Sequence, residues 1–361
     1  MYRIPLQDLA RLHDSVRGEL ELALTRVLDA SRFVADRESR DFEESLATSH
    51  GAAGAVGCAS GTDAVAMTLR GLGIGNGDEV IVPAFCDVGT AEAVLQVGAT
   101  PVFADVEPTS LLLSAASVAE VQTDLTRAVL PVHLYGHCVP FDQLRRWRLE
   151  GLWVIEDVSH APLATWRGEP VGSVGHAACF GFAADLPLGA LGDGGAVVSR
   201  DTALLEEVRR LSDHGRCEGT HQELAWASRL DEIQAALLSV KLAHLADWNE
   251  ATDLLADHYV QALPPGLLVP WEAGAVHHRM VVRPAERDRL AAVLEHIAIG
   301  TGVHYPRPAC EHPVFDTWHA EVPNARKAAA TVLSLPIDPL MRTAEVADVC
   351  DAVAGAARQA A

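Results

Sequence analysis

The chain has 361 residues, of which 49% are hydrophobic and 21% are charged, a composition typical of a folded globular protein. Its formal net charge of −21 repels a phosphate backbone, so we expect no nucleic-acid partner. No apolar run approaches the roughly 20 residues of a membrane span, and the charged N-terminal stretch does not resemble a signal peptide, so we predict a cytoplasmic protein that does not enter a membrane.

The predicted elements begin with helices and continue as strands that alternate with helices. In residues 1–50, apolar side chains such as Leu6, Leu9 and Leu12 recur at helical spacing. Short β-branched runs follow, and they predict strands near 55–57 and at Asp78–Pro83, Thr100–Val106, Arg127–His133, Leu152–Asp157, His176–Phe182 and Gly195–Ser199. This alternation predicts βαβ units and a mainly parallel sheet that is covered on both faces.

A long amphipathic helix is predicted for Leu230–Trp248, after a capping signal formed by Ser228 and Asp231. Its apolar stripe consists of Leu230, Ile233, Leu237, Val240 and Leu245. We expect this stripe to supply apolar surface for a dimer interface. A second α+β stretch begins after Pro264, so the boundary is predicted near Asp247, with a large domain at 1–247 and a small domain at 248–361.

The first local signal for chemistry is Ser60-Gly61-Thr62, which joins a predicted strand to a helix that runs through Leu72. Backbone N–H groups at such a helix start form a ready site for an anion. The alternative is a helix cap by Ser60 or Thr62 without any ligand. By itself, the segment favours the cap.

A second signal lies at the end of the predicted buried strand Leu152–Asp157, where Asp157 is followed by His160. Ligands of open α/β sheets bind beyond the carboxyl ends of strands, so both residues are candidates for a site. The alternative is that Asp157 only caps the next segment. A glycine-dense loop at 188–195 is typical of a tight turn when it is taken alone.

Neither the cysteines nor the histidines predict a metal site. The seven cysteines are widely spaced and contain no CxxC pair, which also argues against a disulfide framework. The sixteen histidines contain no HxH or HExxH set. We therefore predict that the chain binds no metal.

Seven segments, considered together and in order, resemble the DegT-type sugar aminotransferases. They are Ser-Gly-Thr-Asp-Ala at 60–64, Gly-Asp-Glu-Val-Ile-Val-Pro-Ala at 77–84, Leu-Pro-Val-His-Leu-Tyr-Gly at 130–136, Ile-Glu-Asp at 155–157, Leu-Gly-Ala-Leu-Gly-Asp-Gly-Gly at 188–195, Ser-Arg-Leu-Asp-Glu-Ile-Gln-Ala-Ala at 228–236 and Gly-Thr-Gly-Val-His-Tyr-Pro at 300–306. The resemblance implies the α/β aspartate-aminotransferase-like fold (fold-type-I), with a seven-stranded large domain, a smaller C-terminal α+β domain and a homodimer. It also implies pyridoxal 5′-phosphate (PLP) and transfer of an amino group to a keto-sugar.

The Schiff-base lysine of the family falls at Leu186, within Phe180-Gly-Phe-Ala-Ala-Asp-Leu-Pro-Leu-Gly189. The chain has only two lysines, Lys241 and Lys327, and the resemblance places both away from the cofactor. A Schiff base needs an amine, which leucine lacks. The resemblance therefore implies a family member that cannot hold its cofactor covalently.

Other cofactor contacts of the family are also replaced. The aromatic residue that stacks on the cofactor ring in the family falls at Asp87, and the serine that binds the phosphate falls at Gly181. The asparagine that reaches the phosphate from the partner subunit falls at Ala227. The glutamine near the phenolic oxygen falls at His160, and the small residue under the ring falls at Ser159. Gly61, Thr62 and the pyridine-nitrogen carboxylate Asp157 remain. Because each hydrogen bond to a charged group contributes about 1.5–3 kcal/mol, we predict a polar pocket that holds no cofactor.

These replacements predict an enzyme that works without PLP, by acid–base catalysis on a sugar or specialised-metabolite intermediate such as occurs in antibiotic biosynthesis. Dehydration, isomerisation and cyclisation need only proton transfers. The predicted catalytic residues are Asp157, His160 and Asp87. The predicted substrate-binding residues are Ser60, Gly61, Thr62, Ser159, His133, Tyr135, Leu186, His304 and Tyr305. Gly61 and Thr62 are expected to anchor an anionic group, whereas His133 is alternatively a satisfied histidine of the core.

Two other functions stay open at this point. The chain is alternatively a non-catalytic subunit that pairs with a lysine-bearing homologue and completes that protein's site. It is alternatively a dehydratase or aminotransferase that uses pyridoxamine phosphate (PMP) formed elsewhere. The alternative to catalysis is a relic pocket, whose polar residues are tolerated because water fills it.

Overall fold

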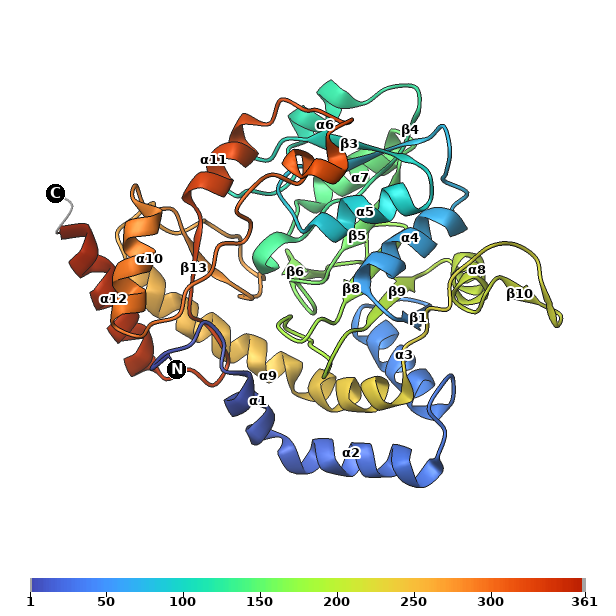
Figure 1. Cartoon of the computed structure of the whole chain (residues 1–361), viewed down its shortest axis with the longest axis horizontal. Coiled ribbons are helices and arrows are strands. Elements are labelled where there is room, and N and C mark those ends of the chain that lie inside the picture. The colour runs from blue at the N-terminus through green and yellow to red at the C-terminus, as the bar shows by residue number, and fades with distance from the viewer. Residues whose placement is uncertain (1, 359–361) are drawn as a thin grey trace.

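A seven-stranded sheet forms the centre of the structure, a computed structural model that describes residues 2–358 (Figure 1). Its strands are β1 (Gly54–Cys58), β2 (Glu79–Pro83), β3 (Thr100–Ala104), β4 (Thr126–Val129), β5 (Trp153–Asp157), β8 (Ala177–Gly181) and β9 (Gly195–Ser199). They lie in the order β1-β9-β8-β5-β4-β2-β3, and within this sheet β9 alone runs antiparallel to its neighbours. The predicted seven-stranded, mainly parallel sheet is confirmed.

The central strands are apolar because both faces of the sheet are covered. Val80, Ile81 and Val82 of β2 have no exposed surface, which is the pattern expected of a doubly buried parallel strand. The strand predicted for Arg127–His133 is shorter, because β4 ends at Val129. Pro131 follows shortly after and has no N–H group to extend the ladder.

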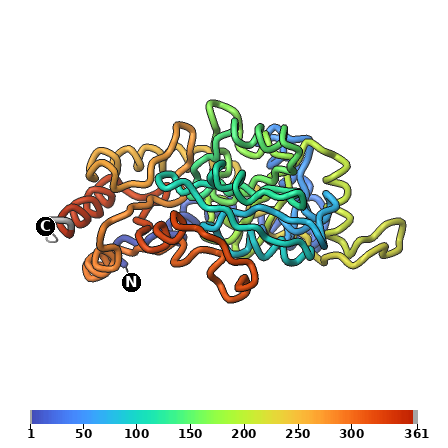
Figure 2. The backbone as a smooth tube through the Cα atoms, turned by 90° about the horizontal axis from the view of Figure 1, so that it is seen from above, coloured from blue at the N-terminus to red at the C-terminus, as the bar shows by residue number. Residues whose placement is uncertain are grey.

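Helices pack around the sheet, and two short hairpins lie outside it (Figures 1 and 2). The helices of this part are α3 (Arg37–Ser49), α4 (Gly61–Gly71), α5 (Val88–Gln96), α6 (Ala115–Val121), α7 (Phe141–Leu149) and α8 (Thr202–Ser212). The hairpins are β6 (Thr165–Trp166) with β7 (Glu169–Pro170), and β10 (Arg216–Cys217) with β11 (Thr220–His221). The second hairpin is exposed and projects from the body (Figure 2).

The longest helix, α9, spans Glu232–Ala262 and therefore continues well beyond the predicted end at Trp248. It packs against α2 (Arg17–Ala30) and α3 of the same chain (Figure 1). Leu237 and Leu245 of the predicted stripe are 3% and 0% exposed. The expectation that this stripe supplies a dimer surface is wrong for Leu230, Leu237 and Leu245, because the chain buries them internally, and stays a prediction for the partly exposed Ile233 and Val240. Neither α9 nor any other described helix combines the length and apolarity that a membrane span requires.

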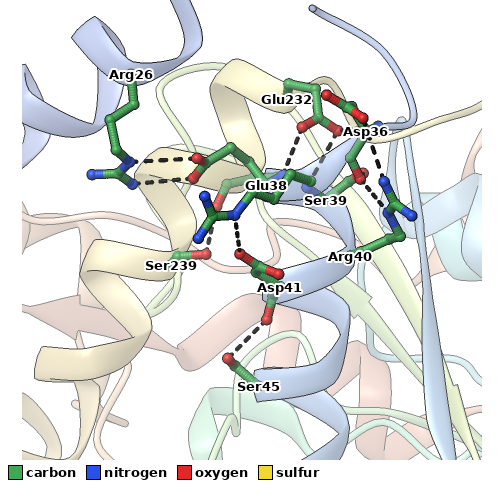
Figure 3. A network of polar contacts seen from close by, with 11 residues as sticks. Arg26, Asp36, Glu38, Ser39, Arg40, Asp41, Ser45, Glu232 and Ser239 are labelled. Carbon is green, nitrogen blue, oxygen red and sulfur yellow. Dashed lines mark hydrogen bonds and ion pairs between the residues drawn. The ribbon is translucent and has the colours of Figure 1, made fainter. Parts of the chain in front are cut away.

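The start of α9 also holds the start of α3 in place (Figure 3). The buried Glu232 carboxylate accepts hydrogen bonds from the backbone N–H groups of Asp36, Glu38 and Ser39 at 2.8, 2.7 and 3.2 Å. Asp36 precedes α3 but forms no side-chain cap, so Glu232 takes the part of an N-cap from another helix. Arg26 of α2 pairs with Glu38 at 3.1 Å and ties the third helix to this junction.

A group of elements that lies beside the sheet (Figure 1) has its own hydrophobic core. It is built by the C-terminal half of α9 with α10 (Arg287–His296), α12 (Thr343–Arg358) and the two-stranded sheet of β12 (Met280–Val282) and β13 (Leu333–Leu335). The N-terminal segment before α1 (Leu9–Ser15) joins it through a bridge between Ile4 and Ile299. In contrast, α11 (Pro323–Thr331) packs on the first core. Because α9 runs unbroken through residue 247, the domain division at that residue stays a prediction.

Candidate active site

A cavity of about 310 Å³ lies at the carboxyl ends of β1, β2, β5 and β8. This is the edge at which open α/β sheets bind ligands. Ten of the residues predicted from the sequence line it, namely Ser60, Gly61, Thr62, Asp87, Asp157, Ser159, His160, Leu186, His304 and Tyr305. The fold thus brings together segments that are up to 245 positions apart in the sequence.

The start of α4 forms one wall of the cavity. The Ser60 side chain accepts the N–H of Asp63 at 3.1 Å and is therefore a helix cap, as the simpler interpretation predicted. Gly61 is needed for close packing, since a Cβ there would lie 2.9 Å from the Cα of Gly181 in β8. The N–H groups of Gly61 and Thr62 belong to the first turn, where no helical carbonyl can accept them. The cap and a positively polarised wall therefore coexist at this end.

Asp157 ends β5 and lies in the floor of the cavity. One carboxylate oxygen accepts the Ser159 N–H at 3.1 Å, and the other accepts the Thr90 hydroxyl at 3.2 Å. Burial raises the pKa of Asp157, the neighbouring Asp87 charge adds to that effect, and the bonds from Ser159 and Thr90 oppose it only in part. Such a carboxyl group takes up and releases a proton closer to neutral pH than an exposed one does.

Asp87 stands directly before α5 and shares the cavity with Asp157. Its Oδ1 accepts the N–H of Gly89 at 2.8 Å, so it also caps α5. A Cβ on Gly89 would lie 2.6 Å from the Thr62 hydroxyl oxygen and 3.0 Å from Asp87 Oδ1. The glycine therefore lets the starts of α4 and α5 approach each other, and this approach brings the Asp87 carboxylate beside Thr62.

His160 lines the cavity as a neutral imidazole. Its Nδ1 accepts the backbone N–H of Tyr135 at 3.1 Å, so the ring proton is assigned to Nε2. Burial lowers the pKa of His160 to about 3, and the charge of Arg279 acts in the same direction. Tyr135 adopts a left-handed conformation, with φ of 62°, at this turn. The arrangement makes His160 a hydrogen-bond donor to a ligand rather than a base.

The structure does not place His133 or Tyr135 on the cavity surface, which corrects the expectation that they bind substrate. His133 is fully buried, and its Nε2 donates to Glu156 at 2.9 Å while its Nδ1 accepts the Val139 N–H at 3.1 Å. It is the satisfied core histidine of the alternative interpretation. The Tyr135 hydroxyl is also buried and donates to the His304 carbonyl. Tyr135 therefore positions His160 and His304 and does not contact the cavity itself.

Five polar lining residues were not found from the sequence, namely Thr90, Asp185, Asp193, His278 and Arg279. Arg279 stands immediately before β12 and directly after two adjacent histidines. His278 lines the cavity, whereas His277 Nε2 contacts Asp253 at 3.0 Å. The run His-His-Arg before an apolar strand was the one sequence feature that could have indicated these residues as part of the site. Only tertiary packing, however, brings that strand to the cavity. No cluster suited to a metal ion occurs among the described residues.

The amine that holds PLP in this type of fold has no counterpart in the cavity. Of the two lysines in the chain, Lys241 is buried in α9, with its Nζ 2.5 Å from the Gly189 carbonyl and 3.0 Å from His13 Nε2. Lys327 is exposed on α11. Neither lines the cavity, whereas Leu186 does. No lining residue can therefore form a covalent bond of that kind.

The residues at the positions where the family holds the phosphate and the ring of PLP also do not suit this cofactor. A Cβ on Gly181 would lie 3.2 Å from the Ser159 hydroxyl oxygen and 3.4 Å from Leu186 Cδ1, so a serine side chain there would be crowded. Asp87 offers a carboxylate in place of a flat aromatic face. The start of α4 and the Asp157 carboxylate are the groups that still suit such a cofactor. We therefore derive no chemical step through PLP.

Comparison with known proteins places the chain in a family. A model of the DegT/DnrJ/EryC1/StrS aminotransferase family matches residues 14–354. The chain is 39% identical to a dTDP-3-amino-3,4,6-trideoxy-alpha-D-glucose transaminase of Streptomyces venezuelae, over 97% of this chain and 95% of that protein. It is 34% identical to a dTDP-3-amino-3,6-dideoxy-alpha-D-galactopyranose transaminase of Aneurinibacillus thermoaerophilus, over 97% of this chain and 98% of that one.

Solved structures agree with this assignment. DesV of S. venezuelae superposes with a TM-score of 0.94 at 39% identity, over 98% of both chains. NtdA of Bacillus subtilis, solved with bound cofactor PMP, superposes with a TM-score of 0.91 at 26% identity, over 99% of this chain and 85% of that one. The predicted aspartate-aminotransferase-like fold is thereby confirmed. The chain belongs to the DegT/DnrJ/EryC1/StrS aminotransferase family.

Proposed function

We propose that this chain is an enzyme that transfers protons on a keto-sugar or related metabolite without PLP. The observation that carries the proposal is the lining of the cavity, where an amine is absent and Asp157, Asp87 and His160 are present. The names of the relatives support a sugar-derived substrate, since both are sugar transaminases. The reaction is a dehydration, an isomerisation or a cyclisation.

The first step assigned to the cavity is removal of a proton from a carbon beside the substrate carbonyl. Asp157 takes the proton as a general base, and the C–H electron pair becomes the new C=C bond. The carbonyl electron pair moves to oxygen, where the Nε2–H of His160 stabilises the developing charge. A neutral imidazole suits this part because it donates a hydrogen bond without first needing to be protonated.

The second step returns the proton that Asp157 has gained. If the deprotonated carbon bears a hydroxyl group, the former carbonyl carbon accepts the proton, the hydroxyl proton passes to the former carbonyl oxygen, and the carbonyl reforms at the deprotonated carbon, which is an isomerisation. If the proton instead reaches a hydroxyl group on the carbon beyond the deprotonated one, that C–O bond breaks and water leaves, while the enolate electrons restore the carbonyl and form a C=C bond between these two carbons, which is a dehydration. Asp87 is assigned as the second carboxylate beside that group, and the α4 N–H groups of Gly61 and Thr62 hold an anionic part of the substrate.

A second candidate function is a dehydratase or aminotransferase that uses PMP. Two observations favour it, namely the free N–H wall at the start of α4 and the Asp157 carboxylate, which suit a phosphate and a pyridine nitrogen. A related structure, NtdA, contains PMP. We rank this function second because Asp87, Gly181 and Leu186 leave the ring and phosphate with few other partners.

The purified chain is expected to show no cofactor absorbance after dialysis, and titration with PLP is expected to leave the spectrum of free PLP unchanged. Leu186→Lys is expected to behave in the same way, because the new amine would lie among the carboxylates Asp87, Asp157 and Asp185, which keep it protonated. Cofactor binding by the wild type and by Leu186→Lys is measured by ultraviolet–visible titration with PLP and by fluorescence titration with PMP.

The S. venezuelae transaminase provides the matched control for these titrations. A stoichiometric cofactor band in the wild-type chain, or tight PMP binding, would overturn the cofactor-independent proposal and favour the second candidate. Tight PLP binding by Leu186→Lys, with conversion to PMP by an amino donor, would show that only the lysine was lost. In that case the polar pocket is a relic.

We also propose that the chain assembles as a homodimer, as its resemblance to the family implies. With most of the α9 stripe buried, the apolar surface available for this contact includes Leu22, Leu28, Phe33 and Val34, which are 46–66% exposed on α2 and the loop after it. Light scattering is expected to give twice the 38.5 kDa of one chain. A monomer that associates only with a lysine-bearing homologue would support the non-catalytic subunit instead.

A further inference from the structure

Arg279 is a buried guanidinium group whose hydrogen bonds are incomplete. It is 4% exposed and lines the cavity, and its Nη2 pairs with Asp185 Oδ2 at 2.7 Å. Its Nη1 is buried and has no hydrogen-bond partner. The adjacent His278 also lines the cavity, and its buried Nδ1 is likewise without a partner. Two unsatisfied polar atoms thus occur on neighbouring residues of one cavity.

A buried N–H group without an acceptor is unusual, because it loses water and gains nothing in exchange. The Asp185 side chain does not provide the missing acceptor for Nη1, since it is 57% exposed and contacts only the Nη2 side of the guanidinium. Solvent also screens the charge of an exposed carboxylate. Arg279 therefore retains a positive charge on the side that faces away from Asp185.

The other charges of the cavity single out this position for an anion. Arg279 is the one lysine or arginine among the lining residues, and four aspartates accompany it at 87, 157, 185 and 193. The three lining histidines add no positive charge. Burial lowers the pKa of His160 to about 3 and of His304 to about 4, it also lowers the pKa of His278, and the charge of Arg279 reinforces each effect.

We propose that Arg279, whose guanidinium retains an unpaired Nη1, binds a carboxylate of the substrate in this cavity, with His278 as the neighbouring polar group. The ligand is assigned as a monoanion rather than a phosphate, because a single guanidinium group can pair with one carboxylate, whereas the four lining aspartates repel a dianion more strongly. The inference rests on the proposed function only in taking this cavity as the substrate site. It assigns a second anchor, separate from the N–H groups of Gly61 and Thr62, and so identifies the substrate as a sugar acid or a comparable carboxylic acid.

The test uses acetate as the probe, because it is small enough for the cavity and has an uncharged counterpart in acetamide. Saturation-transfer NMR titrations of the full chain, at constant ionic strength with chloride, are expected to show binding of acetate and not of acetamide. Arg279→Gln is expected to weaken acetate binding about tenfold or more. Arg283→Gln, a matched change outside the cavity, is expected to leave it unchanged.

Asp185→Asn provides the sharpest comparison. It frees Nη2 for the ligand and removes a nearby negative charge, so acetate is expected to bind more tightly than in the wild type. If Arg279 only served Asp185 structurally, the substitution would lower the melting temperature and leave acetate binding unchanged. Arg279→Lys, which keeps the charge, is expected to retain part of the binding. Melting curves check the fold of each variant.

The proposal is overturned if Arg279→Gln binds acetate as the wild type does, or if acetamide binds equally well. It is also overturned if inorganic phosphate binds more tightly than acetate and loses that affinity in Arg279→Gln. Should Arg279→Gln fail to fold, the Asp185→Asn titration decides, since unchanged affinity there contradicts the proposal. None of these titrations involves turnover or PLP, so a cofactor-bearing protein would disprove the proposed function and leave this result standing.

Discussion

Replacing Asp157 with asparagine is expected to lower turnover by roughly 10²–10⁴-fold, the usual contribution of a general acid or base. The fold is expected to become more stable at neutral pH. Burial raises the pKa of Asp157 in the folded protein above its unfolded value, so ionisation of this group opposes folding as pH rises. Asparagine removes that charge and can still accept the Ser159 N–H and contact the Thr90 hydroxyl.

Exchange of substrate protons with D₂O, measured by NMR on a panel of keto sugars, reports the first step directly. The wild-type rate is expected to fall as pH drops through the raised pKa of Asp157, because the base must be ionised. Asp105→Asn is the matched control, since Asp105 follows β3 but caps α11 through the N–H groups of Asn324 and Ala325. Wild-type exchange by Asp157→Asn would contradict the assignment of the base.

His160→Ala tests whether His160 stabilises the negative charge that develops on the substrate oxygen when Asp157 removes the proton. Loss of one donor to a developing negative charge is expected to cost about 10²–10³-fold in turnover. The wild-type pH profile is expected to show no limb that belongs to His160 between pH 5 and 8, because the pKa of His160 lies at about 3. An imidazole limb in the wild-type profile that disappears in His160→Ala would mean that His160 acts as a base.

Removing the buried partner of Glu156 is expected to have the largest effect on stability. Glu156 is fully buried and accepts hydrogen bonds from His133 at 2.9 Å, Gly172 at 3.0 Å and Gly175 at 2.6 Å. His133→Ala leaves this carboxylate without its side-chain partner, so a loss of about 3–5 kcal/mol in the free energy of unfolding is expected. Urea denaturation measures the change.

The pH dependence of the same variant gives a second readout. Burial alone would raise the pKa of Glu156, but the bonds from His133 and the glycine N–H groups outweigh it and lower that pKa. The pair therefore stabilises the fold above the unfolded carboxyl pKa, and this contribution is lost as pH falls through the lowered folded value. Acid unfolding of His133→Ala is expected at higher pH than that of the wild type. His176→Ala, a half-buried histidine that contacts the Val154 N–H, serves as the control.

Many features of this protein were predictable because they depend on short stretches of chain. The seven strands follow from apolar runs such as Val80–Val82, and the start of α4 follows from Ser60 and Gly61. Asp157 and Leu186 were identified because each occupies a fixed place within a motif. Hydrophobic period, capping residues and motif spacing are local properties, so they can be read without knowledge of the folded chain.

Other features depend on which segments meet, and only the tertiary structure decided them. Arg279 comes to the cavity because β12 pairs with β13 beside the sheet, whereas His133 turns away because Glu156 lies next to it in the core. Most of the α9 stripe is buried because α2 and α3 pack against this helix. Long-range packing sets burial, and burial sets both the pKa values and the exposed surface. For that reason the neutral state of His160 and the unpaired Nη1 of Arg279 were beyond the reach of sequence pattern.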